Sequence, residues 1–91
     1  MPGSNDGGEH KVCDERPSHT AWILSKDGHT MTCVISGESG REELQVLFDL
    51  EVYLNEQHSV HDGTIGRART LLRGFEAHGW APICVSEALQ R

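Results

Sequence analysis

Four residues in the second half of the chain have the chemistry of metal ligands. His58 and His61 are three positions apart, and His78 and Cys84 follow later in the sequence. A zinc site needs three or four convergent nitrogen or sulfur ligands. Side chains three positions apart share a face on a helix, whereas in the extended exit from a strand they diverge. Weak metal binding is therefore one hypothesis, and solvated histidines are the simpler interpretation that we favour.

Arginine side chains crowd the polar side of a segment with helical periodicity. Arg69 and Arg73 are four positions apart and adjacent on that surface, and Arg67 lies on the same side. Guanidinium groups in this arrangement can receive a carboxylate or a phosphate from a partner. We take Arg67, Arg69 and Arg73 as candidate partner-binding residues, with a solvated helix face as the simpler alternative.

Other short patterns do not support catalysis. Residues 36–40 read Ser-Gly-Glu-Ser-Gly and superficially resemble a nucleophile turn or a phosphate loop, but the alternating residues that follow predict a strand where both motifs need a helix. His10 and Cys13 have ligand spacing without a second ligand pair, and no base is oriented toward Cys84. We therefore assign no catalytic, cofactor-binding or metal-binding residue, expect no cofactor, and lean against enzyme activity.

The composition restricts the class of protein. The chain has 91 residues, of which 36% are hydrophobic and 24% charged, as expected for one soluble globular domain. We find neither an apolar run near the roughly 18 residues of a membrane span nor a signal peptide, so we expect a cytoplasmic protein. The net charge of -6 argues against nucleic-acid binding. Three cysteines without paired spacing favour reduced thiols.

The chain divides into a tail and one domain. Residues 1–18 carry glycine, proline and charged residues and almost nothing apolar, so burial there cannot offset the loss of chain entropy. This composition predicts a disordered N-terminal tail. The remaining residues, 19–91, are expected to form a single α+β domain.

A hairpin is predicted at the start of the domain. Residues 20–25 and 30–36 are rich in β-branched and aromatic side chains. Between them lies Asp27-Gly28, a dipeptide that type I′ hairpin turns favour. If these two residues form the loop, the register is fixed. The expected pairs are Trp22 with Cys33, Leu24 with Met31, and Thr20 with Ile35.

Strict alternation of apolar residues predicts more strand structure at 44–54. The segment is one long strand or two short ones, and we prefer two because strands average about five or six residues. A three-residue loop at 49–51 keeps both halves in phase. One long strand would instead leave an open edge, which predicts a homodimer through the sheet edge. The expected pairs of the second hairpin are Phe48 with Val52 and Val46 with Leu54.

A helix is predicted at residues 62–80. Asp62 is placed to cap its start. Gly79 stands where a left-handed terminating residue belongs, Trp80 follows where a Schellman motif makes its apolar contact, and Pro82 prevents continuation. The apolar stripe of this helix consists of Ile65, Ala68, Leu72 and Phe75.

Together these elements predict an α+β fold, namely a four-stranded antiparallel β-meander of two hairpins with one C-terminal α-helix packed on one face (ββββα). Residues 83–85 are expected to add an extended segment. Gly66 and Gly74 each cost about 1 kcal/mol in a helix interior. A close approach to the sheet would explain both glycines.

Residues 43–46 read Glu-Leu-Gln-Val, and residues 69–80 are rich in alanine and arginine and end in Ala-His-Gly-Trp. With Leu54, these segments resemble small uncharacterised bacterial hypothetical proteins that have a strand meander followed by a helix ending in Gly-Trp. The likeness covers residues 20–80 and departs at 49–51, where Asp-Leu-Glu replaces a glycine-containing turn. The resemblance implies the fold and assigns no catalytic residue.

Our leading functional hypothesis is a small non-catalytic protein-interaction or regulatory domain. Its partner would be another protein, with neither nucleic acid nor membrane expected, and would contact the arginine face or the outer sheet face near Ile23 and Val34. The net negative charge motivates one alternative, an acidic inhibitor that mimics nucleic acid. Weak metal binding is another. The acidic residues of the first alternative are Glu38, Glu42, Glu43, Asp49, Glu51 and Glu56.

Overall fold

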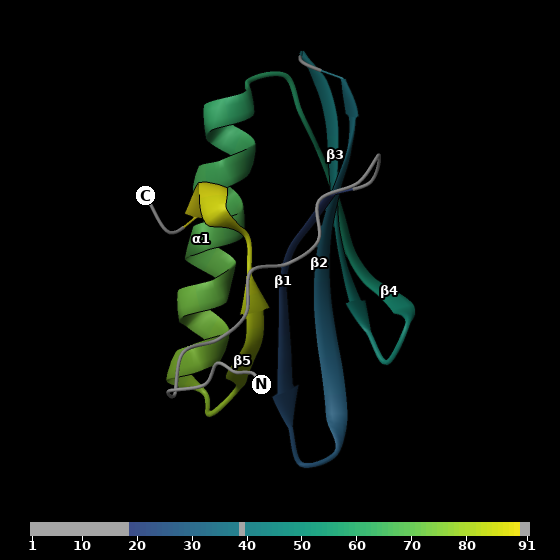
Figure 1. Cartoon of the computed structure of the whole chain (residues 1–91). Coiled ribbons are helices and arrows are strands. Elements are labelled where there is room, and N and C mark those ends of the chain that lie inside the picture. Colours follow the sequence, from purple (N-terminus) through teal and green to yellow (C-terminus); the bar gives the residue numbers. More distant parts are fainter. Residues whose placement is uncertain (1–18, 39, 90–91) are drawn as a thin grey trace, which may run out of the picture.

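The computed structural model describes residues 19–38 and 40–89. The predicted tail at 1–18 lies outside them. The described chain forms a sheet and one long helix (Figure 1), which confirms the α+β class. The elements in order are β1 (His19–Lys26), β2 (His29–Glu38), β3 (Arg41–Phe48), β4 (Glu51–His58), α1 (His61–Ala77), β5 (Ala81–Val85) and the short 3-10 helix η1 (Glu87–Leu89).

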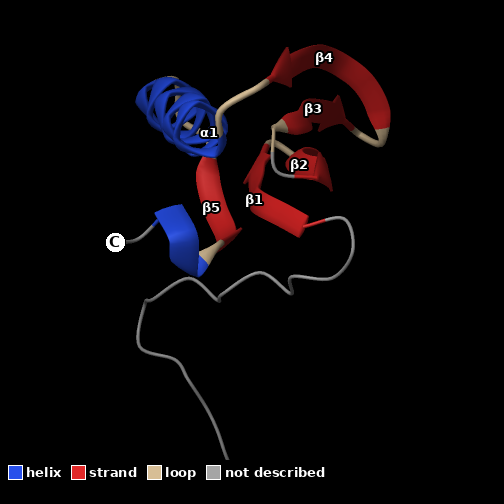
Figure 2. Cartoon of the chain, turned by 90° about the horizontal axis from the view of Figure 1, so that it is seen from above, coloured by secondary structure: helices blue, strands red, loops and turns tan. Residues whose placement is uncertain are grey.

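The sheet has five antiparallel strands in the order β4-β3-β2-β1-β5. Seen from above, α1 lies on one side of this curved sheet (Figure 2). The prediction of four strands is wrong by one, because the chain returns after α1 and pairs with the open side of β1. This strand is only five residues long and contains Pro82. Its sequence signal is therefore weak, although an extended segment was expected there.

The first hairpin has the predicted turn and most of the predicted register. A bulge between Thr20 and Trp22 shifts the end of the ladder, so Thr20 lies opposite Val34 and not opposite Ile35 as predicted. The extra residue, Ala21, is fully buried, which gives the bulge a packing role. The confirmed pairs are Trp22 with Cys33 and Leu24 with Met31.

The 44–54 segment forms two strands, as preferred, but the predicted three-residue loop is wrong. The turn contains only Asp49 and Leu50, which have positive φ angles of 50° and 74°. Phe48 consequently pairs with Glu51 and not with Val52. A two-residue turn of this kind follows the natural twist of a hairpin, and that twist favours it over the longer loop.

One extra residue in β4 compensates for the shorter turn. Leu47 pairs with Val52 and Val46 pairs with Leu54, which leaves Tyr53 as the bulged residue. The predicted pair of Val46 with Leu54 is therefore confirmed. With Leu47 as its partner, Val52 lies on the opposite face of the sheet from Val46, and its side chain is 58% exposed.

Helix α1 begins differently from the prediction and ends as predicted. Its N-cap is Val60, which makes no side-chain capping bond, so the assignment of Asp62 as the cap is wrong. At the other end, the amide of Trp80 donates to the carbonyl of Phe75 (3.1 Å) and that of Gly79 to the carbonyl of Glu76 (3.0 Å). These two bonds define a Schellman motif and confirm the predicted termination.

The predicted apolar stripe of α1 faces the sheet. Ile65, Ala68 and Leu72 are buried, and Phe75 is half-buried against the core. Edge-on ring contacts join Phe75 to Trp22 (5.8 Å between centroids) and to Trp80 (6.3 Å). The core therefore lies between one helix face and the inner face of the sheet. Its strand residues are Trp22, Leu24, Met31, Cys33, Ile35, Leu44 and Val46.

The glycines inside α1 do not serve close packing. A methyl group added at Gly66 or Gly74 would meet no atom within 4 Å. The explanation by close approach to the sheet is therefore wrong. Each of these two residues lowers the helix propensity of α1 by about 1 kcal/mol relative to alanine.

The cysteines differ in state. Cys33 is a free, buried thiol whose burial raises its pKa to about 12, so it is unreactive at neutral pH. Cys84 is disulfide-bonded, and the expectation of reduced thiols is wrong for this residue. Across residues 19–38 and 40–89, no helix has the length and apolarity to cross a bilayer.

Candidate functional site

A carboxylate from the sheet reaches the start of α1. Glu42 lies on β3 and is only 8% exposed. It accepts hydrogen bonds from the hydroxyl of Thr64 (2.6 Å) and from Nδ1 of His61 (2.7 Å). Both donors belong to the first turns of the helix. Glu42 therefore connects two side chains of the first helical turns to the sheet, although it does not replace the backbone capping bond that Val60 lacks.

The electrostatics of Glu42 favour the ionised form. Burial by itself would raise the pKa of this carboxyl, but the hydrogen bonds from Thr64 and His61 and the nearby charge of His61 hold it below its ordinary value. A negative charge beside a helix N-terminus is also favourable. An ionised carboxylate cannot act as a general acid at neutral pH, so this group anchors α1 and does not donate protons.

A second carboxylate holds the next turn of α1. Glu56 on β4 accepts two charge-assisted hydrogen bonds from Arg67, from Nε at 3.0 Å and from Nη2 at 2.9 Å. Nε2 of His58 lies 3.1 Å from Oε1 of the same carboxylate. The guanidinium lowers the pKa of Glu56. Arg67 therefore makes a two-donor ion pair within the chain.

The other two arginines of the candidate partner-binding set do not join this pair. Arg73 is exposed and Arg69 is half-buried. Among the ion pairs of the described residues, none involves either side chain. The structure thus separates Arg67 from Arg69 and Arg73, which the sequence placed in one group.

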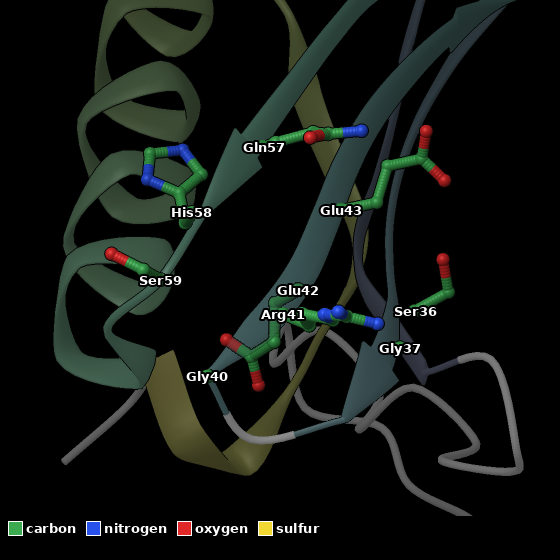
Figure 3. A pocket seen from close by; sticks show the side chains of 9 residues that line it. All are labelled: Ser36, Gly37, Gly40, Arg41, Glu42, Glu43, Gln57, His58 and Ser59. Atoms are coloured by element: carbon green, nitrogen blue, oxygen red, sulfur yellow. The ribbon is translucent and has the colours of Figure 1, made fainter.

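An open pocket lies beside Glu42 at the end of the sheet. It encloses roughly 580 Å³ between the β2–β3 turn and the end of β4. Figure 3 shows His58 and Ser59 at one side of this pocket and Ser36 and Glu43 at the other. Among the described hydrogen bonds, none joins a serine to His58, which instead contacts Glu56. The lining residues are Ser36, Gly37, Gly40, Arg41, Glu42, Glu43, Gln57, His58 and Ser59.

The four residues weighed as metal ligands have separate partners. His58 contacts Glu56, His61 contacts Glu42, and Nδ1 of His78 donates to the carbonyl of Gly74. Cys84 is disulfide-bonded. Over the described ranges, 19–38 and 40–89, no three histidine, cysteine or acidic residues are grouped so that they could hold a metal ion.

The acidic residues of the second hairpin are also largely engaged. The carboxylate of Asp49 accepts from Nδ1 of His29 (2.7 Å) and from the amide of Thr30 (2.9 Å). Glu43 accepts from the side-chain amide of Asn55 (3.0 Å). Together with the pairs made by Glu42 and Glu56, these contacts show that several carboxylates stabilise the hairpin and its contact with α1.

Three large apolar side chains that are exposed to solvent lie close together in the sequence, at the β3–β4 hairpin. Leu50 is 83% exposed, Tyr53 63% and Val52 58%. We name these three residues the β3–β4 tip. Figure 1 shows this hairpin at the side of the sheet opposite β5. Exposed apolar side chains of this size, concentrated in one hairpin, indicate a candidate protein-binding surface.

Leu50 is also unusual in its backbone. Its φ of 74° lies in the left-handed region, which bulky side chains rarely adopt. The first hairpin offers an internal comparison, because its turn has nearly the same geometry at Asp27 (φ 52°) and Gly28 (φ 83°). Where one turn uses glycine, the other therefore uses leucine, and neither backbone preference nor burial favours that choice.

Sequence reasoning missed the β3–β4 tip. Val52 was expected to pair with Phe48, and Leu50 was placed in a three-residue loop. The available signal was Asp49-Leu50 itself, in which a large apolar residue replaces the glycine of a hairpin turn. The fold and its surfaces define an α+β domain with an exposed apolar hairpin. The comparisons with known proteins return no matching family model, curated protein or solved structure.

Proposed function

We propose that this chain is a protein-binding domain and that the β3–β4 tip is its contact with a partner. The observation that carries the proposal is Leu50, which is 83% exposed and held at a φ of 74°. A leucine there lowers the stability of the turn and contributes no burial to the fold. Strained residues that the fold itself does not require are concentrated at functional positions.

Two neighbours strengthen the proposal. Val52 and Tyr53 follow Leu50 in β4 and are both more than half exposed. Aromatic and aliphatic side chains grouped in this way provide the apolar centre of protein interfaces, and tyrosine is among the residues that contribute most to binding energy. Glu42 and Glu56 both pair with side chains of α1, so their presence on the sheet needs no ligand to explain it.

Site-specific cross-linking tests this assignment. A photoreactive phenylalanine analogue is introduced in place of Tyr53 and, as a matched control, in place of Ile83, which is 46% exposed on the opposite edge strand. Irradiation in cells that contain the natural partner should give a cross-linked protein from position 53 and not from position 83. The Leu50→Gly substitution should reduce that product several-fold, because it removes the apolar contact and keeps the turn.

The arginine face of α1 is the alternative contact surface, and it is tested in the same cells. The double variant Arg69→Glu/Arg73→Glu should leave the cross-link at position 53 unchanged. If it abolishes the cross-link while Leu50→Gly has no effect, the arginine face is the contact and the assignment to the β3–β4 tip is wrong. Equal products from positions 53 and 83 would also contradict the proposal.

A further inference from the structure

Strand β4 is an edge strand of the sheet. It pairs with β3 on one side, and no strand of the described chain pairs with its other side. A strand edge presents backbone N–H and C=O groups that another extended chain can bind. Strand addition is a recurring mode of peptide recognition that uses these groups for affinity and the adjacent side chains for specificity.

The two edges of this sheet are not equivalent. The other edge, β5, is five residues long and contains Pro82, which cannot donate a backbone hydrogen bond. Strand β4 is eight residues long and has no proline. Its bulge at Tyr53 leaves residues 54–58 as a regular stretch, which is about the length of an average strand. Of the two edges, β4 is the better template.

The charge of the hairpin indicates what kind of segment fits. Residues 41–58 contain one arginine and five carboxylates. Four of these carboxylates already have a partner within the chain, and the fifth, Glu51, is exposed next to the apolar β3–β4 tip. A second copy of the chain would bring a hairpin of the same negative charge to this edge. A basic segment would instead bring charges of the opposite sign, and this complementarity favours it.

We propose that β4 binds its partner by strand addition, and that the added strand is an extended segment in which lysine or arginine alternates with β-branched or aromatic residues. Its apolar side chains would contact Val52, and its cations would lie near Glu51 on the opposite face of the strand, because successive residues of a strand point to opposite faces. This inference rests on the proposed function, because it names the chemistry of the partner that the same hairpin would bind.

A synthetic peptide tests the proposal directly. The probe is a short fluorescein-labelled peptide of alternating lysine and valine, and its binding to the full chain is measured by fluorescence anisotropy. The counterpart with glutamate in place of lysine should bind at least about tenfold more weakly, because like charges then face each other. Binding of the lysine peptide should also weaken as salt is added.

A backbone-modified peptide separates strand addition from simple charge attraction. Methylation of the backbone nitrogen at every second residue removes the hydrogen-bond donors of one strand edge and keeps every side chain and charge. Two such peptides, methylated on alternate sets of residues, should differ in affinity by about tenfold or more, because only one set of donors faces β4. Equal affinities of the two methylated peptides and the parent would overturn strand addition.

Hydrogen exchange of the protein locates the binding edge without any substitution in the chain. The lysine peptide should slow amide exchange in β4 and leave β5 unchanged. Protection at β5, or self-association of the chain through β4 in sedimentation measurements, would overturn the inference. The proposed function fails separately, when the cross-link at position 53 does not depend on Leu50. Peptide binding by side chains alone, without protection of β4, would leave the proposed function standing and remove only strand addition.

Discussion

Glu42 stabilises α1 from a neighbouring strand. Its carboxylate accepts from Thr64 and from His61, while the helix lacks a side-chain cap of its own. A contact of this kind does more than satisfy one hydroxyl. It fixes the position at which the helix leaves the β4–α1 connection, and it places a negative charge where the helix dipole favours it.

Replacing Thr64 by valine should lower the free energy of unfolding by about 1–3 kcal/mol, because the buried carboxylate of Glu42 loses a hydrogen-bond donor. Urea denaturation followed by circular dichroism measures the change. The matched control is Thr70→Val, at an exposed threonine of the same helix whose hydroxyl donates only to the carbonyl of Gly66. The control should change the stability by less than about 0.5 kcal/mol. Equal effects of the two substitutions would show that Glu42 does not depend on Thr64.

Leu50→Gly should raise the free energy of unfolding by about 1 kcal/mol, because glycine adopts the left-handed backbone without the steric cost that leucine has there. The reverse substitution in the first hairpin, Gly28→Leu, should destabilise by a similar amount. Thermal unfolding of both variants and the wild type measures these shifts. A loss of stability in Leu50→Gly would mean that the leucine side chain supports the fold, and would remove the main reason for a binding role.

Helix α1 combines a well-specified C-terminus with two glycines that weaken its interior. The positive φ of Gly79 (97°) is required by the Schellman motif, and Nζ of Lys26 adds a bond to the carbonyl of His78 (2.7 Å). Gly74, in contrast, has ordinary helical geometry and empty space where a side chain would stand. The same residue type therefore has opposite effects at two positions five residues apart.

Gly74→Ala should accordingly raise the free energy of unfolding by up to about 1 kcal/mol, the difference in helix propensity between the two residues. Gly79→Ala should lower it, because alanine is strained at a φ of 97°. Guanidinium denaturation of both variants provides the measurement. Destabilisation by Gly74→Ala would indicate that this position contacts something, which the open surroundings do not show.

The elements that the sequence predicted well are those with strong local signals. Asp27-Gly28 fixed the first turn, and Gly79 with Trp80 fixed the end of α1. One register error arose where an extra residue, Ala21, enters β1, and the other arose where the β3–β4 turn has two residues in place of three, a difference that the bulge at Tyr53 then compensates. A bulge is set by packing against the rest of the molecule, and local periodicity does not encode it.

The candidate site was harder to predict because it depends on contacts between distant residues. The ion pair of Arg67 with Glu56 and the anchoring of α1 by Glu42 both join the helix to the sheet. Neither can be read from spacing along the chain. The exposure of the β3–β4 tip likewise depends on strand order, since Val52 is solvent-accessible on an edge strand beyond the core.

At the level of the whole molecule, three carboxylates make stability depend on pH. Hydrogen bonds to His29 and to Arg67 lower the pKa values of Asp49 and Glu56, respectively. For Glu42, hydrogen bonds from the helix outweigh the opposing effect of burial. A carboxyl whose pKa is lower in the folded state than in the unfolded state stabilises the fold only when ionised. Its contribution is complete above the unfolded-state value and is lost as the pH falls through the folded-state value.

The contribution of these three carboxylates to the free energy of unfolding should therefore be constant near neutral pH. The free energy of unfolding should fall as the pH drops below about 4.5, which is the ordinary pKa of a glutamate side chain. Urea denaturation at a series of pH values measures this dependence. Thr64→Val should reduce the slope, because it removes one of the bonds that lower the pKa of Glu42. A stability that does not change between neutral pH and about pH 3 would contradict the role assigned to the three carboxylates.

The indole of Trp22 donates a hydrogen bond to the carbonyl of Ala68, at 2.8 Å in the buried interior. This bond joins the middle of β1 to the middle of α1 and fixes the rotation of the helix about its own axis. A helix held in this way cannot slide by one turn past the sheet without leaving an indole donor unpaired in a dry environment. The molecule should consequently bind as a rigid body, and a ligand at β4 should leave the environment of Trp22, and hence its fluorescence, unchanged.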